Sequence, residues 1–214
     1  GKLAVANGIM GLYPTRGKIT IDGRALRLNS PRDSIAAKLA FVSEDRRKQG
    51  FLPALSIEMN MVIPAMMNRD QYFHKLGPFR QVHKRQVETV ARGYIEEFQI
   101  RCTGPKQTVG RRSGGNQQKV GIAKALLLEP DVLLVSEPTR GIDIGAKSLV
   151  LETITRINEE LGMTVIFTSS ELAELRQICD RIAIVSDGRL VDILLPQAGD
   201  EVFGLAMSGK KVES

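Results

Sequence analysis

Short apolar runs and stretches of helical spacing alternate along the second half of the chain. The runs at 132–135 and 164–167 are four residues long, which is typical of strands buried on both faces of a sheet. The predicted strands are Val132–Val135, Thr164–Phe167 and 181–185. The helical stretches that precede or separate them lie at 115–128, 150–161 and 171–179. Strands that alternate with helices predict an α/β fold with a mostly parallel sheet.

The first half of the chain predicts shorter elements. A helix is expected at 5–11. Alternating apolar residues on both sides of Asp22-Gly23 predict a β-hairpin, because this dipeptide accepts the backbone angles of the tightest hairpin turns. A short helix at 31–37 and a strand at 39–42 complete this part.

A long helical pattern extends from Ser56 to Gln99, and we expect it to break at Pro64 and Pro78, since proline interrupts helical hydrogen bonding. This part is strongly basic: residues 68–112 hold ten lysines and arginines against four acidic residues, so their net charge equals the +6 of the whole chain. We interpret the excess as a solvated basic face, with proximity to lipid headgroups as the alternative. No pattern of a nucleic-acid-binding domain occurs in it.

The composition narrows the class of protein. The 214 residues are 43% hydrophobic and 25% charged, which is typical of a globular protein and excludes disordered and collagenous chains. No apolar run approaches the roughly 20 residues of a membrane-spanning helix. Cys102 and Cys179 lie far apart without a metal-binding spacing, so we expect free thiols in a reducing compartment.

Two places along the chain carry candidate chemistry. Ser113-Gly114-Gly115 begins a predicted helix, where glycines leave the first backbone N–H groups unshielded. That end of a helix carries roughly half a positive charge and can bind phosphate, although the pattern alone also fits an ordinary cap with Ser113 as the N-cap residue. Glu137 follows a predicted strand, so its carboxylate would lie in the crevice where parallel sheets bind ligands and could orient a water molecule. The hydroxyls of 168–170 are expected at the same edge.

With these motifs the chain resembles the nucleotide-binding domains of ABC transporters, in particular the second ATP-binding half of the tandem ATPases that import monosaccharides of the ribose, xylose or galactose type. Four stretches carry the resemblance, in matching order and spacing from near Gly11 to the C-terminus. They are 42–47 (VSEDRR), 113–120 (SGGNQQKV), 137–147 (EPTRGIDIGAK) and 169–172 (SSEL). The resemblance implies an α/β core of the P-loop NTPase type with a mostly parallel sheet and a helical subdomain.

The resemblance also implies roles for single residues. The ABC signature, which contacts the γ-phosphate of ATP held by the opposite domain, would comprise Ser113, Gly114, Gly115 and Gln117. Glu137 matches the catalytic carboxylate that orients the attacking water. Asp143 matches the D-loop, which crosses the dimer interface.

Three positions depart from the general family pattern. Glu44 stands where the Q-loop, which links the site to the transmembrane partner, has its glutamine. Ser170 occupies the place of the switch histidine. Ser136 replaces the Walker B aspartate that holds the water shell of magnesium, and a hydroxyl lacks the charge that favours a hard cation. We therefore expect the site centred on Glu137 to be degenerate, with no metal ligands of its own.

The 214 residues contain no phosphate-binding loop of the form Gly-x4-Gly-Lys-Ser/Thr. Gly1-Lys2 match the end of a degenerate loop, but Leu3 lacks the hydroxyl, so we expect an N-terminally truncated chain. The predicted parts are the remainder of the ATPase core with an antiparallel hairpin at 1–52, the helical subdomain at 53–112, the ATPase core with the signature, Walker B-like and switch segments at 113–207, and a flexible tail at 208–214.

The resemblance implies a nucleotide-binding module of a carbohydrate importer, whose signature completes an ATP site in a partner half. We expect ATP and Mg²⁺ to be bound by the intact assembly, and the isolated chain to be inactive. The implied partners are a first ATPase half or a second copy, transmembrane permease subunits and, indirectly, a periplasmic sugar-binding protein, but no nucleic acid. The implied location is the cytoplasmic face of the cell membrane. Two alternatives stay open: an ABC-type protein acting on ribosomes or nucleic acid, and a non-catalytic structural module.

Overall fold

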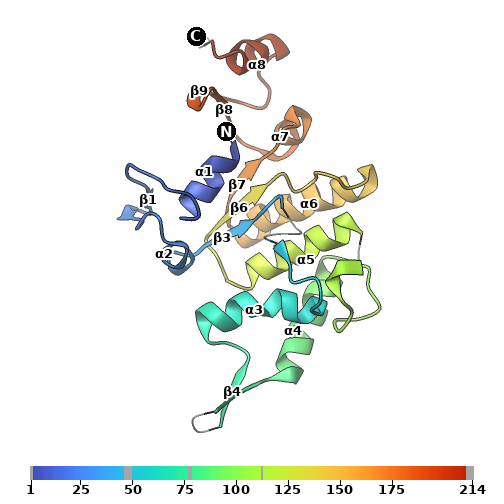
Figure 1. The fold of residues 1–214 in the computed structure, drawn as a ribbon. Coiled ribbons are helices and arrows are strands. Elements are labelled where there is room, and N and C mark those ends of the chain that lie inside the picture. The colour runs from blue at the N-terminus through green and yellow to red at the C-terminus, as the bar shows by residue number, and fades with distance from the viewer. Residues whose placement is uncertain (1, 46–49, 77–78, 112, 211–214) are drawn as a thin grey trace.

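A three-stranded parallel sheet lies at the centre of the molecule (Figure 1). The computed structural model describes residues 2–45, 50–76, 79–111 and 113–210. The sheet consists of β3 (Leu39–Val42), β6 (Val132–Ser136) and β7 (Thr164–Thr168), in the order β3-β6-β7. Val42 pairs with Val135 and Ser136 with Thr168, so the carboxyl ends of the three strands meet at one edge. The predicted α/β fold with parallel strands is confirmed.

Three antiparallel hairpins accompany the sheet. They are β1 (Thr20–Ile21) with β2 (Arg24–Ala25), β4 (Phe73–Leu76) with β5 (Phe79–Val82), and β8 (Ile182–Ser186) with β9 (Arg189–Leu194). Asp22 and Gly23 form the first turn, with φ of 48° and 76°. Positive φ at both central residues is what a two-residue hairpin turn requires, and the hairpin predicted at this dipeptide is confirmed.

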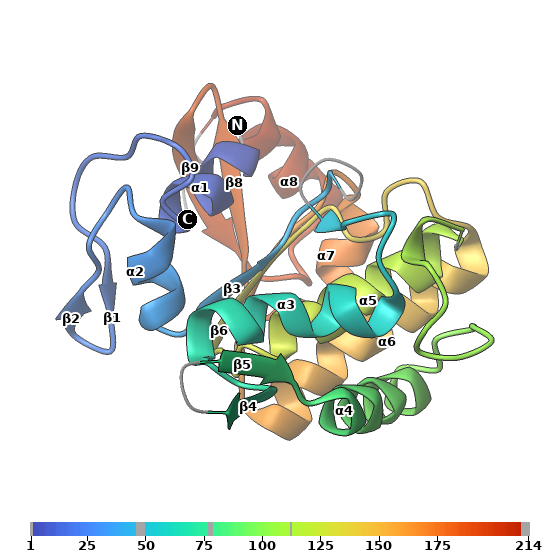
Figure 2. The same cartoon turned by 60° about the horizontal axis from the view of Figure 1, so that its bottom comes forward.

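Helices cover both faces of the sheet. They are α1 (Lys2–Ile9), α2 (Pro31–Ala36), α3 (Ile57–Arg69), α4 (Lys84–Glu97), α5 (Gly114–Leu126), α6 (Ile144–Leu161), α7 (Leu172–Ile178) and α8 (Asp200–Met207), with a short 3-10 helix at Val109–Arg111. Figures 1 and 2 show α5 and α6 next to each other against one face, with α3 packed on α5. Helix α1 packs on the opposite face, against β6.

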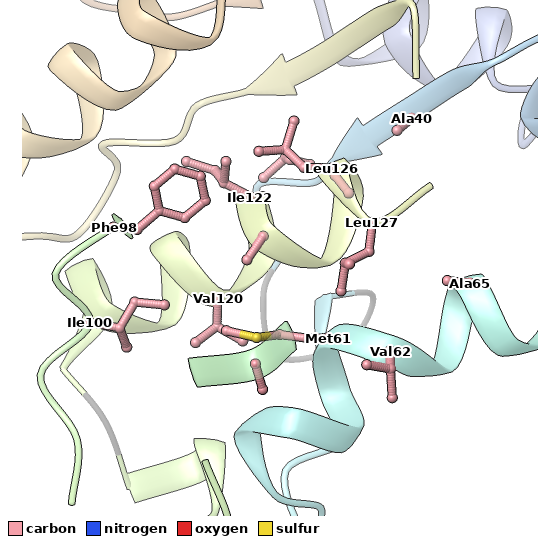
Figure 3. Close-up of a cluster of buried hydrophobic side chains, with 14 of the residues drawn as sticks. Ala40, Met61, Val62, Ala65, Phe98, Ile100, Val120, Ile122, Leu126 and Leu127 are labelled. Carbon is pink, nitrogen blue, oxygen red and sulfur yellow. The ribbon is translucent and has the colours of Figure 1, made fainter. Parts of the chain in front are cut away.

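The alternation of β6 explains why two apolar clusters form. Leu133 and Val135 point into the larger cluster, which α3, α4, α5 and α6 share, whereas Leu134 packs with Ala6 and Met10 on the face of α1. Figure 3 shows part of the larger cluster, where Val120, Ile122 and Leu126 of α5 are surrounded by side chains of the helices and the sheet. Helix α5 is thereby held against the sheet.

The helical pattern predicted from Ser56 to Gln99 is wrong in two respects. Helix α3 continues through Pro64 to Arg69 without a break. Its buried residues Met61, Val62, Ala65 and Met66 flank the proline, and we attribute the continuity to this burial, which offsets the roughly 3 kcal/mol that proline costs inside a helix. Residues 73–76 and 79–82 are the antiparallel strands β4 and β5 and not helical. The break expected at Pro78 lies outside the described residues.

Helix α8 is not predicted from the sequence. Its Phe203 and Ala206 pack against β8. Of the helices in the described ranges, none combines the length and the apolar composition needed to cross a bilayer.

Candidate functional site

The carboxyl edge of the parallel sheet gathers polar side chains from the ends of β6 and β7. Glu137 directly follows β6 and is buried, with 6% of its surface exposed. Ser170 follows β7, and its hydroxyl donates a hydrogen bond to Oε2 of Glu137 over 3.0 Å. The backbone N–H of Glu137 donates to the carbonyl of Thr168 over 2.8 Å. A carboxylate is thus held at the edge where parallel α/β sheets bind ligands.

The backbone of Glu137 is in the left-handed region, with φ of 45°. This region is unfavourable for residues other than glycine. Such residues persist only where the surrounding structure holds them, and they concentrate at functional sites. At Glu137, one of several described non-glycine residues with positive φ, this backbone conformation coincides with a position at the edge of the sheet.

Ser136 does not fit a magnesium site. Its side chain is fully buried, and its Oγ lies 2.9 Å from Oγ1 of Thr168, so the two hydroxyls bond to each other across β6 and β7. A hydroxyl engaged in this way offers no negative charge to a hard cation. Among the residues that the structure describes, no three His, Cys, Asp or Glu side chains are grouped to hold a metal ion.

Glu44 lies beside the segment that follows Glu137. Nη1 of Arg140 is 3.6 Å from Oε2 of Glu44, and 20% of the Glu44 side chain is exposed. The loop after β3 and the loop after β6 therefore meet through an ion pair. Positions 46 and 47 of the VSEDRR stretch lie outside the described residues.

Asp143 begins α6. It is the N-cap residue, and its Oδ1 accepts a hydrogen bond from the backbone N–H of Ala146 over 2.9 Å. One turn further, Nζ of Lys147 lies 2.5 Å from Oε1 of Glu171 in the loop after β7. The hydrogen bond to the Glu171 carboxylate raises the pKa of the Lys147 ammonium group. The first turn of α6 is thus tied to the loop that carries Ser170.

Glu174 of α7 is a second buried carboxylate close to this edge, with 5% of its surface exposed. Its Oε2 accepts hydrogen bonds from the hydroxyl of Thr139 over 2.8 Å and from that of Ser169 over 2.7 Å. Its Oε1 lies 3.4 Å from Nζ of Lys147. The loops after β6 and β7 are therefore joined through one carboxylate.

The start of α5 lies against the start of α6. Ser113 is at the N-cap position but does not cap a backbone N–H with its side chain; its Oγ accepts a hydrogen bond from the Asn116 amide over 2.9 Å. A β-carbon on Gly115 would lie 2.7 Å from that of Ala146, so the two helices approach each other as closely as a glycine allows. The amide of Gln117 donates to the carbonyl of Val109 over 3.4 Å. The first turn of α5 contains no acidic residue.

A cavity of about 350 Å³ opens between α5, the end of β3 and the turn after α1. Its lining residues are Asn7, Leu12, Tyr13, Phe41, Val42, Ser43, Gly50, Phe51, Gln118, Gly121 and Lys124. Nζ of Lys124 donates to the carbonyl of Gly50 over 2.8 Å, and burial lowers the pKa of this lysine. Gln118 is buried, with 2% of its surface exposed.

The sequence predicts that Glu137 and the 168–170 hydroxyls lie at one edge, and this is confirmed. Glu44 joins them through Arg140, and Asp143 through the first turn of α6. Two features were not predicted: the contacts of Glu174 with Lys147, and the cavity beside Ser43. Ion pairs between separate loops leave no local spacing in the sequence, and Glu174 looks like any polar position of an amphipathic helix.

This chain matches a family model and is similar in sequence to a curated protein. A family model described as ABC transporter matches residues 1–140. The ribose import ATP-binding protein RbsA of Caldanaerobacter subterraneus subsp. tengcongensis is 36% identical over 211 residues, which cover 98% of this chain and 41% of that protein. The chain thus spans about two fifths of the length of this curated relative.

Solved structures share the fold. The ATP-binding cassette MJ0796, in a dimer described as a post-hydrolysis state bound to ADP and phosphate, matches with a TM-score of 0.74 at 22% identity over 93% of this chain and 82% of that chain. The protein cbiO1 of Clostridium perfringens, described as part of the ABC transporter complex cbiONQ, matches with a TM-score of 0.72 at 22% identity over 97% of this chain and 76% of that chain.

Proposed function

This chain belongs to the ABC transporter family, and from that premise we propose that it is a nucleotide-binding module of a carbohydrate importer. In this proposal Ser113–Gly115 and Gln117 contribute the signature to an ATP site whose other side belongs to a partner. The partner is a first ATPase half or a second copy of this chain. The identity to a ribose import ATP-binding protein supports the substrate class, a sugar or a related small molecule.

The geometry at the start of α5 is the observation that supports the signature role. The helix is 13 residues long, its first turn holds no acidic residue, and the Ser113 side chain makes no capping hydrogen bond to it. The positive end of the helix dipole therefore has no carboxylate of its own helix beside it, and Ser113 is exposed. This end would attract a phosphate group supplied from outside the chain.

The chain's own site, centred on Glu137, is degenerate in this proposal. The Ser136 hydroxyl is hydrogen-bonded to that of Thr168 and does not fit the role of a Mg²⁺ ligand, so we derive no step through a metal ion at this site. Its residues would serve to shape the surface that faces the partner. ATP hydrolysis with Mg²⁺ would then take place in the assembly, at the site to which the signature is supplied.

A transmembrane permease is the second proposed partner, and the cavity beside Ser43 is where we expect it to dock. Tyr13, Phe41 and Phe51 give the cavity apolar walls, and Lys124 gives it a cation. Glu44 directly follows Ser43 and contacts Arg140, so a segment bound in the cavity would touch the loop that leads to the edge of the sheet. The chain would lie on the cytoplasmic face of the membrane, and a periplasmic sugar-binding protein would act through the permease.

Substituting Gly114→Asp tests the proposal. A carboxylate at the start of α5 would stand against a terminal phosphate, so ATP-dependent sugar uptake by the assembled transporter should fall at least about a hundredfold. Uptake is measured in proteoliposomes that contain the permease and both ATPase halves.

The matched control is Gly93→Asp, because Gly93 is also a helical glycine, in α4, with open space around its α-carbon. It should leave uptake near the wild-type rate. Normal uptake by the Gly114→Asp transporter, with the variant folded by circular dichroism, would contradict the signature assignment.

A further inference from the structure

We infer that Lys147 is a positioning residue: its ammonium group holds the first turn of α6 to the loop after β7, and thereby fixes both segments at the edge of the sheet. The inference deepens the proposed function, because these segments include Asp143 and Ser170. It concerns contacts within this chain and needs no bound nucleotide to be tested.

Lys147 contacts two carboxylates on the same neighbouring segment. Its Nζ lies 2.5 Å from Oε1 of Glu171 and 3.4 Å from Oε1 of Glu174, and 25% of its side chain is exposed. Glu171 is half exposed and belongs to the loop, whereas Glu174 is buried in α7. One cation therefore joins α6 to the loop and to the helix that follows it.

The charge of Lys147 matters because it lies beside Glu174, a buried carboxylate that joins two loops. Oε2 of Glu174 accepts the hydroxyls of Thr139 and Ser169, which leaves Oε1 as the oxygen that Lys147 approaches. A buried carboxylate is costly unless a cation compensates it. Without the ammonium group, Glu174 would draw in water, and its bonds to the loops after β6 and β7 would loosen.

The same turn of α6 also bounds the start of α5. Ala146, the residue before Lys147, is the one that a β-carbon on Gly115 would strike at 2.7 Å. A displacement of this turn therefore changes the space available to Gly115. Lys147 consequently acts on two surfaces: on the Glu137 edge through Glu171 and Glu174, and on the start of α5 through packing.

Hydrogen–deuterium exchange of the chain with Lys147→Met tests the inference. Methionine keeps most of the length and the apolar stem but has no charge. Amides of 139–147 and 168–175 should exchange roughly tenfold faster, in line with the strength of hydrogen bonds to charged groups. A smaller increase is expected at 114–118, and none in α1 or β8. Lys147→Arg should restore slow exchange, because arginine supplies the same charge at a similar reach.

Two further variants give the experiment its controls. Adding Glu174→Gln to Lys147→Met should bring exchange back toward the wild type, since it removes the uncompensated charge and keeps an acceptor for the two hydroxyls. Lys38→Met breaks another lysine–carboxylate pair, with Asp131 at 3.1 Å, at the opposite end of the strands, and should leave 139–147 and 168–175 unchanged. Unchanged exchange in Lys147→Met, or an equal increase along the whole chain, would overturn the positioning role.

Turnover of the assembled transporter separates this inference from the proposed function. Lys147→Met should lower kcat for ATP and leave KM near the wild-type value, because Lys147 is placed to act through its neighbours. Absence of ATP turnover and of sugar uptake in the wild-type assembly would contradict the proposed function and leave the exchange result intact, whereas unchanged exchange in Lys147→Met would contradict the positioning role alone.

Discussion

The packing of α5 on α6 requires a glycine at position 115, whether or not a phosphate binds at the start of α5. Its α-carbon faces Ala146 across the contact of α5 and α6, and a β-carbon there would lie 2.7 Å from the alanine methyl group, a distance that real contacts essentially never show. The glycine therefore sets how closely the two helices approach. That approach places the start of α5 beside the first turn of α6.

Gly115→Ala should destabilise the fold. The added methyl group overpacks a buried contact, so we expect the free energy of unfolding to fall by about 1–3 kcal/mol, measured by urea denaturation. Ala146→Gly in the same chain should recover most of the loss, because it removes the opposing methyl group.

Gly93→Ala is the matched control, since nothing lies within 4 Å of the β-carbon it would add. Alanine is the better helix former, so this variant should be as stable as the wild type or more stable by up to about 1 kcal/mol. A loss in Gly93→Ala equal to that in Gly115→Ala would show that packing on α6 is not the cause.

At the scale of elements, one buried side chain holds the start of helix α3 to the segment before it. Asn60, 3% exposed, ties the helix to the segment before it: its Oδ1 accepts from the N–H of Leu52 over 2.8 Å. Its Nδ2 donates to the carbonyls of Leu52, Leu55 and Ser56 over 3.0–3.3 Å. The start of α3 is thus held by one amide.

Asn60→Ala should lower the free energy of unfolding by about 1–3 kcal/mol, because it removes a buried amide that bonds to the N–H of Leu52 and to three carbonyls. Thermal or urea unfolding followed by circular dichroism measures the change. Asn68→Ala on the same helix is the control: its amide donates to the carbonyl of Pro64 at an exposed position, and the loss should stay within about 0.5 kcal/mol. Equal losses in the two variants would contradict this account.

Elements with a strong local signal could be predicted from the sequence, and others could not. The apolar runs at 39–42 and 132–135 became strands within one residue of their predicted ends, and Asp22-Gly23 became the turn of a hairpin. Pro64 was misjudged because the packing that outweighs its cost comes from other segments. The β4–β5 hairpin was missed because its four-residue strands lie inside a longer stretch of helical spacing, in which Pro78 predicts a break in a helix.

At the scale of the whole molecule, we predict that this chain by itself hydrolyses ATP negligibly. The 214 residues contain no Gly-x4-Gly-Lys-Ser/Thr string, and Ser136 does not fit Mg²⁺, so this chain by itself lacks groups that position and neutralise the phosphates. Steady-state phosphate release by the chain should stay below about 1% of the turnover of the assembled transporter. Glu137→Gln should not change it. Release well above background that disappears in Glu137→Gln would refute the prediction.

The candidate site follows from the topology more than from any single motif. Because β3, β6 and β7 are parallel, residues 44, 137 and 170, far apart in the sequence, meet at one edge, and this much could be predicted. The ion pair of Glu44 with Arg140 and the contacts of Glu174 could not, since they depend on the paths of loops. Long-range pairs of this kind become visible only when the whole chain is folded.

The left-handed backbone of Glu137 has a consequence for anyone who engineers this protein. At φ of 45° a side chain costs on the order of 1–3 kcal/mol, a cost that glycine escapes. Directed evolution for heat tolerance alone would favour glycine here and would discard the acidic group in the same step. Libraries that aim at a more heat-stable protein should therefore keep codon 137 fixed and seek their gains elsewhere.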